Sequence, residues 1–127
     1  MIVHFILYVR DQKSSTAFYS NVLQTRPCLD VPGMTEFQIN DNCILGLMPE
    51  GGIKRLLGAS LPDPSSASGI PRAELYLFTG NAAAFYERAV ASGATPLDVV
   101  SPRDWGDSVG YCMDADGHVI AFAEKTE

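Results

Sequence analysis

Short apolar runs and helix-like segments alternate along this chain in an order that occurs twice. Val3 to Val9 is apolar and rich in β-branched and aromatic residues, which predicts a mostly buried strand. Asp11 can cap the helix that follows, where apolar residues recur at helical spacing. A short strand at 28–31 and a hairpin formed by 35–39 and 43–48 complete a β-α-β-β-β order.

The second half of the chain repeats this order. The pattern predicts a strand at 73–78, a helix capped by Asn81, and strands at 95–100, 108–113 and 119–123. An internal duplication of about 60 residues explains the two halves better than any single motif does.

A stretch poor in structure-forming residues separates the halves. Nine of the 14 residues at 58–71 are Gly, Pro or Ser, so we expect a linker loop without regular structure there. The predicted organisation is a first module at 1–57, the linker at 58–71 and a second module at 72–127. At this length, the modules together form one domain.

Alternation along the first strand of each module assigns the two faces of each sheet. His4 and Tyr8 share one side of their strand, opposite a wholly apolar side. Glu74 and Tyr76 share the corresponding side in the second module. We expect the apolar sides to pack on the helices and the polar-tipped sides to line a ligand cavity with apolar walls.

Several segments together resemble one known family. They are HFILYVRD from His4 onward, the helix segment Ser15 to Leu23, and the closing stretches Trp105 to Asp107 and Asp114 to Phe122. In this combination nearly the whole chain resembles the vicinal oxygen chelate superfamily, also called the glyoxalase/bleomycin resistance protein/dioxygenase family. The resemblance implies an α+β fold in which two β-α-β-β-β modules form curved mixed sheets around a cleft. It also implies a homodimer. Gln24 differs from the family pattern, which usually has glycine after that helix.

The resemblance further indicates where a metal would bind. Family enzymes usually place four ligands on the first and fourth strands of the two modules. His4 and Glu74 are competent ligands, whereas Gly46 and Ala121 have no coordinating side chain. Catalytic zinc sites generally keep three protein ligands, so two would hold a divalent ion weakly. We therefore expect no metal and no other cofactor.

Aromatic and flexible apolar residues are further candidates for the cavity wall. Trp105, the only tryptophan, lies in a predicted loop, where it either stacks on a planar ligand or anchors the loop. Tyr111 either lines the cleft or supports Trp105, and Met48 is an adaptable filler that suits cavities and cores alike. The predicted ligand-binding set is His4, Tyr8, Met48, Glu74, Tyr76, Trp105 and Tyr111, and no residue is assigned a catalytic role.

Charge and composition narrow the range of partners. Nine Lys and Arg against 15 Asp and Glu leave a net charge of −6, without the basic stripe that nucleic acid or an anionic membrane requires. No apolar run approaches the roughly 18 residues of a membrane-spanning helix. Cys28, Cys43 and Cys112 are odd in number and widely spaced, which is typical of a reduced cytoplasmic protein.

The sequence therefore predicts a cytoplasmic homodimer that binds a small, partly apolar or cationic organic molecule without a metal. Members of the family that sequester drugs are the nearest functional type. The alternative is a metal-dependent lyase, isomerase or thiol transferase of the glyoxalase type, which would need extra ligands from a partner chain or a loop. A third interpretation is a regulatory module or a structural dimer without a ligand.

Overall fold

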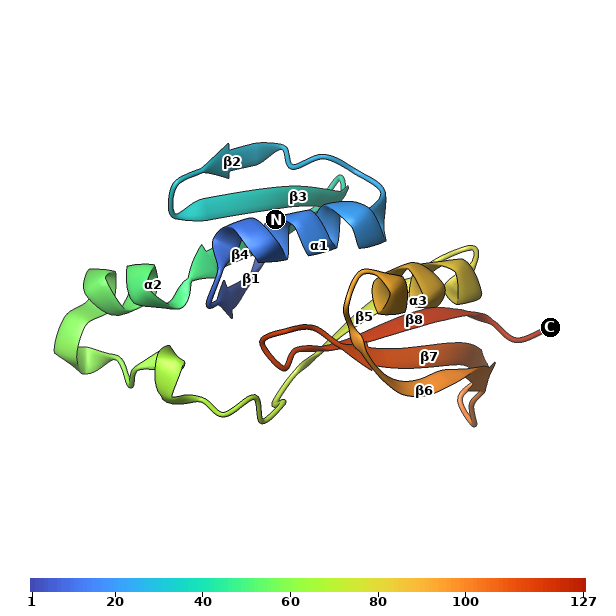
Figure 1. The fold of residues 1–127 in the computed structure, drawn as a ribbon. Coiled ribbons are helices and arrows are strands. Elements are labelled where there is room, and N and C mark those ends of the chain that lie inside the picture. Colours follow the sequence, from blue (N-terminus) through green and yellow to red (C-terminus); the bar gives the residue numbers. More distant parts are fainter. The chain divides into compact units, whose positions relative to one another are not determined.

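The computed structural model describes residues 1–127 and contains two compact units, Met1–Ser68 and Gly69–Glu127. Each unit has a four-stranded mixed sheet and a helix that follows its first strand (Figure 1). The predicted α+β class is confirmed. None of the helices has the length and apolar character needed to cross a membrane.

The first unit contains every element that the pattern predicted between residues 3 and 49. The elements are β1 (Val3–Val9), α1 (Gln12–Leu23), β2 (Leu29–Val31), β3 (Met34–Asn40), β4 (Cys43–Pro49) and α2 (Glu50–Leu57). The strand order is β1-β4-β3-β2. β1 runs parallel to β4, and the other neighbours are antiparallel.

The second unit has the same topology. Its elements are β5 (Glu74–Phe78), α3 (Ala82–Ala91), β6 (Thr95–Pro102), β7 (Asp107–Met113) and β8 (Val119–Lys125). The strand order is β5-β8-β7-β6, again with one parallel pair, β5 and β8. The repeated order predicted from the sequence is therefore present in the structure.

The two main helices begin alike and end differently. The side chains of Asp11 and Asn81 accept hydrogen bonds from the backbone N–H three residues later, at 3.0 and 3.1 Å, which is the usual N-cap arrangement. Gly93 follows α3 with a φ of 109°, a conformation that costs glycine little. After α1 this role falls to Gln24, the one non-glycine residue with positive φ, at 53°. Gln24 thus adopts the same left-handed conformation as a glycine would, but with an energetic cost from its Cβ atom.

Each sheet buries the face that lies against its helix. In the first unit Leu7, Val9 and Phe37 on the strands and Val22 on α1 are fully or nearly fully buried. In the second unit Phe122 is fully buried, and its ring centroid lies 5.9 Å from that of Phe85 on α3. The predicted assignment of apolar strand sides to the helices is confirmed.

The segment between the sheets is more ordered than we expected. α2 was not predicted, and two short 3-10 helices, Gly58–Ser60 and Pro64–Ser66, lie within the expected structureless linker. The side-chain ammonium of Lys54 donates to the carbonyls of Gly58 and Leu61 at 3.0 and 2.6 Å and so ties this segment together. The prediction was wrong here because Pro and Ser also suit the first turn of a short helix, which Asp63 caps.

Candidate functional site

The first sheet has an open face, on the side away from α1. Strand register places its residues, since His4 pairs with Ile44 and Tyr8 with Met48, so these side chains project from the same side. We call this side the first open face; it comprises His4, Ile6, Tyr8, Met34, Glu36, Gln38, Ile44, Gly46 and Met48.

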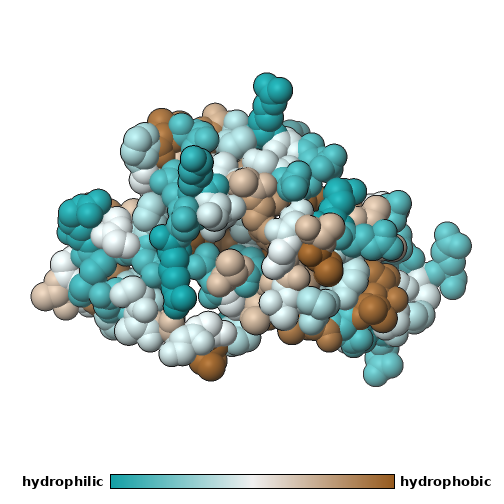
Figure 2. Space-filling view, in the orientation of Figure 1, coloured by the Kyte–Doolittle hydropathy of each residue, from teal (hydrophilic) through white to brown (hydrophobic).

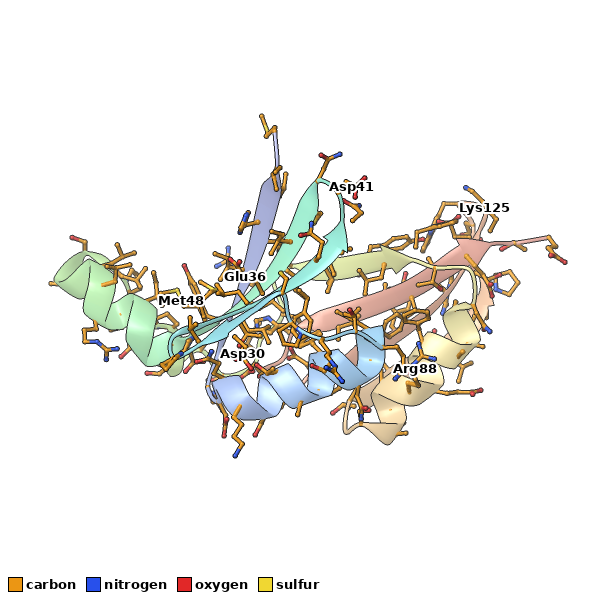
Figure 3. All side chains as sticks on the ribbon, turned by 90° about the horizontal axis from the view of Figure 1, so that it is seen from above. Asp30, Glu36, Asp41, Met48, Arg88 and Lys125 are labelled. Atoms are coloured by element: carbon orange, nitrogen blue, oxygen red, sulfur yellow. The ribbon has the colours of Figure 1, made fainter.

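A contact between a histidine and a carboxylate spans the centre of the first open face. The Nδ1 atom of His4 on β1 lies 3.3 Å from the Oε2 atom of Glu36 on β3, with β4 between the two strands. Glu36 lies directly opposite Gly46, which has no side chain to separate the pair. Figure 3 labels Glu36 in this sheet. Glu36 was not among the predicted site residues, although its two-residue spacing from Met34 could have indicated its face.

Tyr8 and Met48 lie at the end of the first open face from which β4 continues into α2. A Cβ atom added to Gly52 of α2 would lie 3.9 Å from the Cε atom of Met48. Met48 therefore packs close to α2, which favours the packing interpretation over a freely exposed cavity filler.

The second sheet has a corresponding open face that is lined by rings. Register places Tyr76 opposite Ala121, and Ala121 opposite Tyr111. Tyr111 packs on the buried side chains of Val109, Ala121 and Ala123. We call this side the second open face; it comprises Glu74, Tyr76, Phe78, Asp107, Val109, Tyr111, Ala121, Ala123 and Lys125.

A chain of polar contacts links the loop tryptophan to the second open face. The indole Nε1–H of Trp105 donates to the hydroxyl oxygen of Tyr76 at 3.1 Å, and this hydroxyl donates to Oδ2 of Asp107 at 2.5 Å. The other Asp107 oxygen is buried and lies 3.3 Å from the ammonium of Lys125. The loop is thus anchored, as one interpretation of Trp105 expected, while Trp105 remains 57 % exposed.

The surroundings lower the pKa of the carboxyl group on the second open face and raise the pKa values of the two phenols. The hydrogen bond from Tyr76 is the largest cause that lowers the pKa of Asp107, and Lys125 lowers it further. Partial burial and then the hydrogen bond to Asp107 raise the pKa of Tyr76. Burial and the charge of Glu74 raise the pKa of Tyr111. At neutral pH the second open face therefore carries neutral phenols beside an ionised carboxylate.

Two cations of the chain already lie over rings of this face. The guanidinium carbon of Arg103 is 5.2 Å from the centroid of Tyr111, and the ammonium of Lys125 is 5.7 Å from that of Phe78. Arg103 also donates to the carbonyls of Val99 and Val109, so it is firmly held. Lys125, which Figure 3 labels, has a side chain that is 76 % exposed. Asp107, Arg103 and Lys125 were missed by the sequence analysis, although Asp107 shares the parity of Tyr111.

The predicted site residues thus fall into two groups. His4, Tyr8 and Met48 belong to the first open face, whereas Glu74, Tyr76 and Tyr111 belong to the second, with Trp105 joined to it by a hydrogen bond. On the side of the protein seen in Figure 2, apolar side chains reach the surface in separate patches between hydrophilic ones.

Candidate metal donors gather only at the turn between β7 and β8. Donor atoms of Asp114, Asp116 and His118 lie within 4.8 Å of one another. However, one oxygen of Asp114 accepts the backbone N–H groups of both Asp116 and His118, each at 2.9 Å. This carboxylate organises the turn between β7 and β8, after which His118 is half-buried.

A hollow of about 710 Å³ lies at the start of α1, beside the turn between β2 and β3. Arg10, Gln12, Lys13 and Asp30 are among the residues that line it. The buried hydroxyl of Thr35 receives hydrogen bonds from Gln12 and Thr16 and donates to Asp30. These bonds join α1 to the β2–β3 hairpin, which gives the polar groups a structural role.

The comparison with known families agrees with this architecture. Residues 1–122 match the family model of the Glyoxalase/Bleomycin resistance protein/Dioxygenase superfamily, and the chain belongs to this superfamily. A search of curated proteins found no match.

Solved structures share the fold at low sequence identity. A glyoxalase-related enzyme from Fulvimarina pelagi is 22 % identical with a TM-score of 0.82, covering 98 % of this chain and 88 % of that one. A glyoxalase/bleomycin resistance protein/dioxygenase family enzyme from Burkholderia phytofirmans PsJN is 14 % identical with a TM-score of 0.82, covering 97 % of both chains. TioX from Micromonospora sp. ML1 is 16 % identical with a TM-score of 0.68, covering 99 % of this chain and 98 % of that one. These likenesses concern the fold alone.

Proposed function

We propose that the protein binds a small, partly apolar organic molecule without a metal, and that the ligand contacts the rings of the second open face. The observation that carries this proposal is the Trp105–Tyr76–Asp107 chain. Its hydrogen bonds occupy the indole N–H and the Tyr76 hydroxyl and leave both rings partly exposed. Rings whose own polar tips are already hydrogen-bonded favour stacking on a planar ligand over hydrogen bonding to it.

The charges on this face support a cationic ligand. Lys125 over Phe78 and Arg103 over Tyr111 demonstrate that these rings accommodate positive charge. Lys125 is mostly exposed, so a ligand cation can displace it from Phe78. Glu74 adds a carboxylate that forms no ion pair in the structure, and the protein carries a net charge of −6. Sequestration of a cationic aromatic drug is the biological role that fits this chemistry.

Metal independence is supported by two equivalent positions, one in each module. The fourth-strand residues Gly46 and Ala121 lie on the two open faces at the centres of their sheets, where neither can coordinate an ion. The space above Gly46 is narrow, because an added Cβ would approach Ile6 within 3.0 Å and the sulfur of Met34 within 3.4 Å.

The single tryptophan makes the binding proposal directly testable. The indole Nε1–H resonance of Trp105 would be followed by ¹H–¹⁵N NMR during titration with N-methylquinolinium, a planar cation, and with neutral quinoline. We expect the cation to shift this resonance with the higher affinity. Phe78→Leu should weaken cation binding about three- to tenfold, since a cation–π contact contributes about 0.5–1 kcal/mol and more when it is desolvated. Phe5→Leu, in the other module, is the matched control. Equal affinity for both probes, or no response of Trp105, would refute the proposal.

Calorimetric titration with Zn²⁺, Ni²⁺ and Mn²⁺ tests metal independence. We expect no stoichiometric site of micromolar affinity. Such a site, lost in both His4→Ala and Glu74→Gln, would instead support the glyoxalase-type enzyme.

A cytoplasmic homodimer is a further part of the proposal. It rests on the free cysteines, the low charged fraction of 19 % and membership of the superfamily. Light scattering after size exclusion should give twice the chain mass of 13.7 kDa, and the mass of a single chain would contradict the dimer.

A further inference from the structure

The contact with Glu36 on the first open face has a chemical consequence for His4. An ionised carboxylate can only accept hydrogen bonds, whereas a neutral imidazole has one nitrogen that donates and one that accepts. Glu36 lies 3.3 Å from Nδ1 of His4 and therefore favours the proton on that nitrogen. The lone pair is then left on Nε2.

The structure leaves the His4 side chain partly exposed and Nε2 without a partner. Among residues 1–127, the contact with Glu36 is the polar interaction that His4 forms, and its side chain is 43 % exposed. The Glu36 side chain is 19 % exposed and lies opposite Gly46, so no side chain of β4 stands directly beside it. The carboxylate is thus the more buried member of the pair and the imidazole the more exposed one.

We propose that Glu36 is a positioning residue that holds neutral His4 in the Nδ1–H tautomer, so that Nε2 accepts a hydrogen bond from a hydroxyl or N–H group of a bound molecule. The tautomer follows from the contact between His4 and Glu36 alone, whereas the ligand contact rests on the proposed small-molecule binding. The first open face thereby selects molecules with a polar hydrogen.

Histidine NMR tests the tautomer without any ligand. Long-range ¹H–¹⁵N correlations would be recorded well above the ordinary imidazole pKa of about 6.5. We expect the Nδ1–H pattern for His4 and, in Glu36→Met, a shift toward the Nε2–H form that isolated histidine prefers. Gln38→Met, on the same strand and face, should leave His4 unchanged, and His118 in the other module serves as the internal reference. An Nε2–H pattern in the unmodified protein, or no change in Glu36→Met, would overturn the proposal.

A matched pair of small probes tests the acceptor role. Phenol carries a hydroxyl donor, and anisole is the same ring with that hydrogen replaced by methyl. We expect phenol to shift the Nε2 resonance of His4, anisole to shift it much less, and Glu36→Met to reduce the phenol response at least threefold. Equal responses to the two probes would refute the acceptor role.

The two proposals fail separately. If His4 shows the Nε2–H tautomer while Trp105 still responds to N-methylquinolinium, only the proposal about His4 and Glu36 is refuted. If Trp105 does not respond while His4 discriminates phenol from anisole, the proposed function falls and the pairing of His4 with Glu36 stands.

Discussion

The same three positions carry different chemistry in the two modules. Across the centre of the first sheet the register aligns Ile6, Gly46 and Glu36, whereas the equivalent row of the second sheet aligns Tyr76, Ala121 and Tyr111. The small middle residue is common to both rows. In the first module Glu36 reaches across the fourth strand to His4, two residues before Ile6, and in the second two phenols flank Ala121, so a shared backbone supports two unlike surfaces.

The layers that face the helices differ less between the two modules than the open faces do. Each layer contains a large buried ring, but the ring lies on a different strand. In the first module the large ring is Phe37 on β3, and in the second it is Phe122 on β8. Gly110, opposite Phe122, leaves room for its neighbours, since an added Cβ would lie 2.7 Å from Val100 and 3.0 Å from Tyr86. Close packing restricts these layers, whereas the open faces vary freely.

Removal of either buried ring should have the largest effect on stability. We expect Phe37→Ala and Phe122→Ala each to lower the free energy of unfolding by about 3–5 kcal/mol, because each leaves a cavity in a closely packed layer. Urea denaturation measures this loss. Leu56→Ala, at a side chain that is 71 % exposed, should change stability by no more than about 0.5 kcal/mol. A loss below about 1 kcal/mol in one module alone would break the equivalence of the two layers.

The helix ends should respond to substitution in opposite directions. Gly93→Ala places a side chain on a left-handed residue and should cost about 1–2 kcal/mol. Gln24→Gly relieves the same strain after α1 and should stabilise by about 0.5–1 kcal/mol, although the hydrogen bond from the Gln24 amide to the Asn21 carbonyl is lost. Thermal unfolding compares both variants with the parent. Destabilisation by Gln24→Gly would show that the side-chain bond outweighs the backbone strain.

The polar chain of the second open face should contribute less than the buried rings. Tyr76→Phe removes the hydroxyl that joins Trp105 to Asp107 and should cost about 1–2 kcal/mol. The indole resonance of Trp105 should move as well, since its N–H loses its acceptor. Tyr8→Phe is the matched substitution on the first open face and should leave the Trp105 resonance in place.

The pH-dependent contribution of Asp107 to stability should be the smallest of these effects. Its pKa is lowered in the folded state, so the ionised form stabilises the fold above the ordinary aspartate value of about 3.9. This contribution is lost as the pH falls through the lowered pKa. The difference in Tm between the parent and Asp107→Asn should therefore be full near neutral pH and shrink below about pH 4. In a Tyr76→Phe background the pH dependence should be weaker, and an unchanged dependence would assign the shift to Lys125.

Local patterns in the sequence were sufficient to predict the strands and helices of the two repeats and the side of each strand that faces its helix. Helix caps at Asp11 and Asn81 act within one turn, and strand alternation needs only neighbouring residues, so both were predictable. α2 was missed because it is only eight residues long and has Gly51 and Gly52 in its first turn, where glycine disfavours a helix.

The partners on each open face depended on tertiary structure. His4 meets Glu36 across an intervening strand, and Trp105 bonds to Tyr76 from 29 residues away. Such contacts depend on strand order and register, which arise from packing and hydrogen bonding between segments distant in the chain. The sequence by itself determined the repeat, the caps and the side of each strand that faces its helix. Only the folded sheets decided which side chains meet, because a residue's position along its own strand does not specify the register of its neighbours.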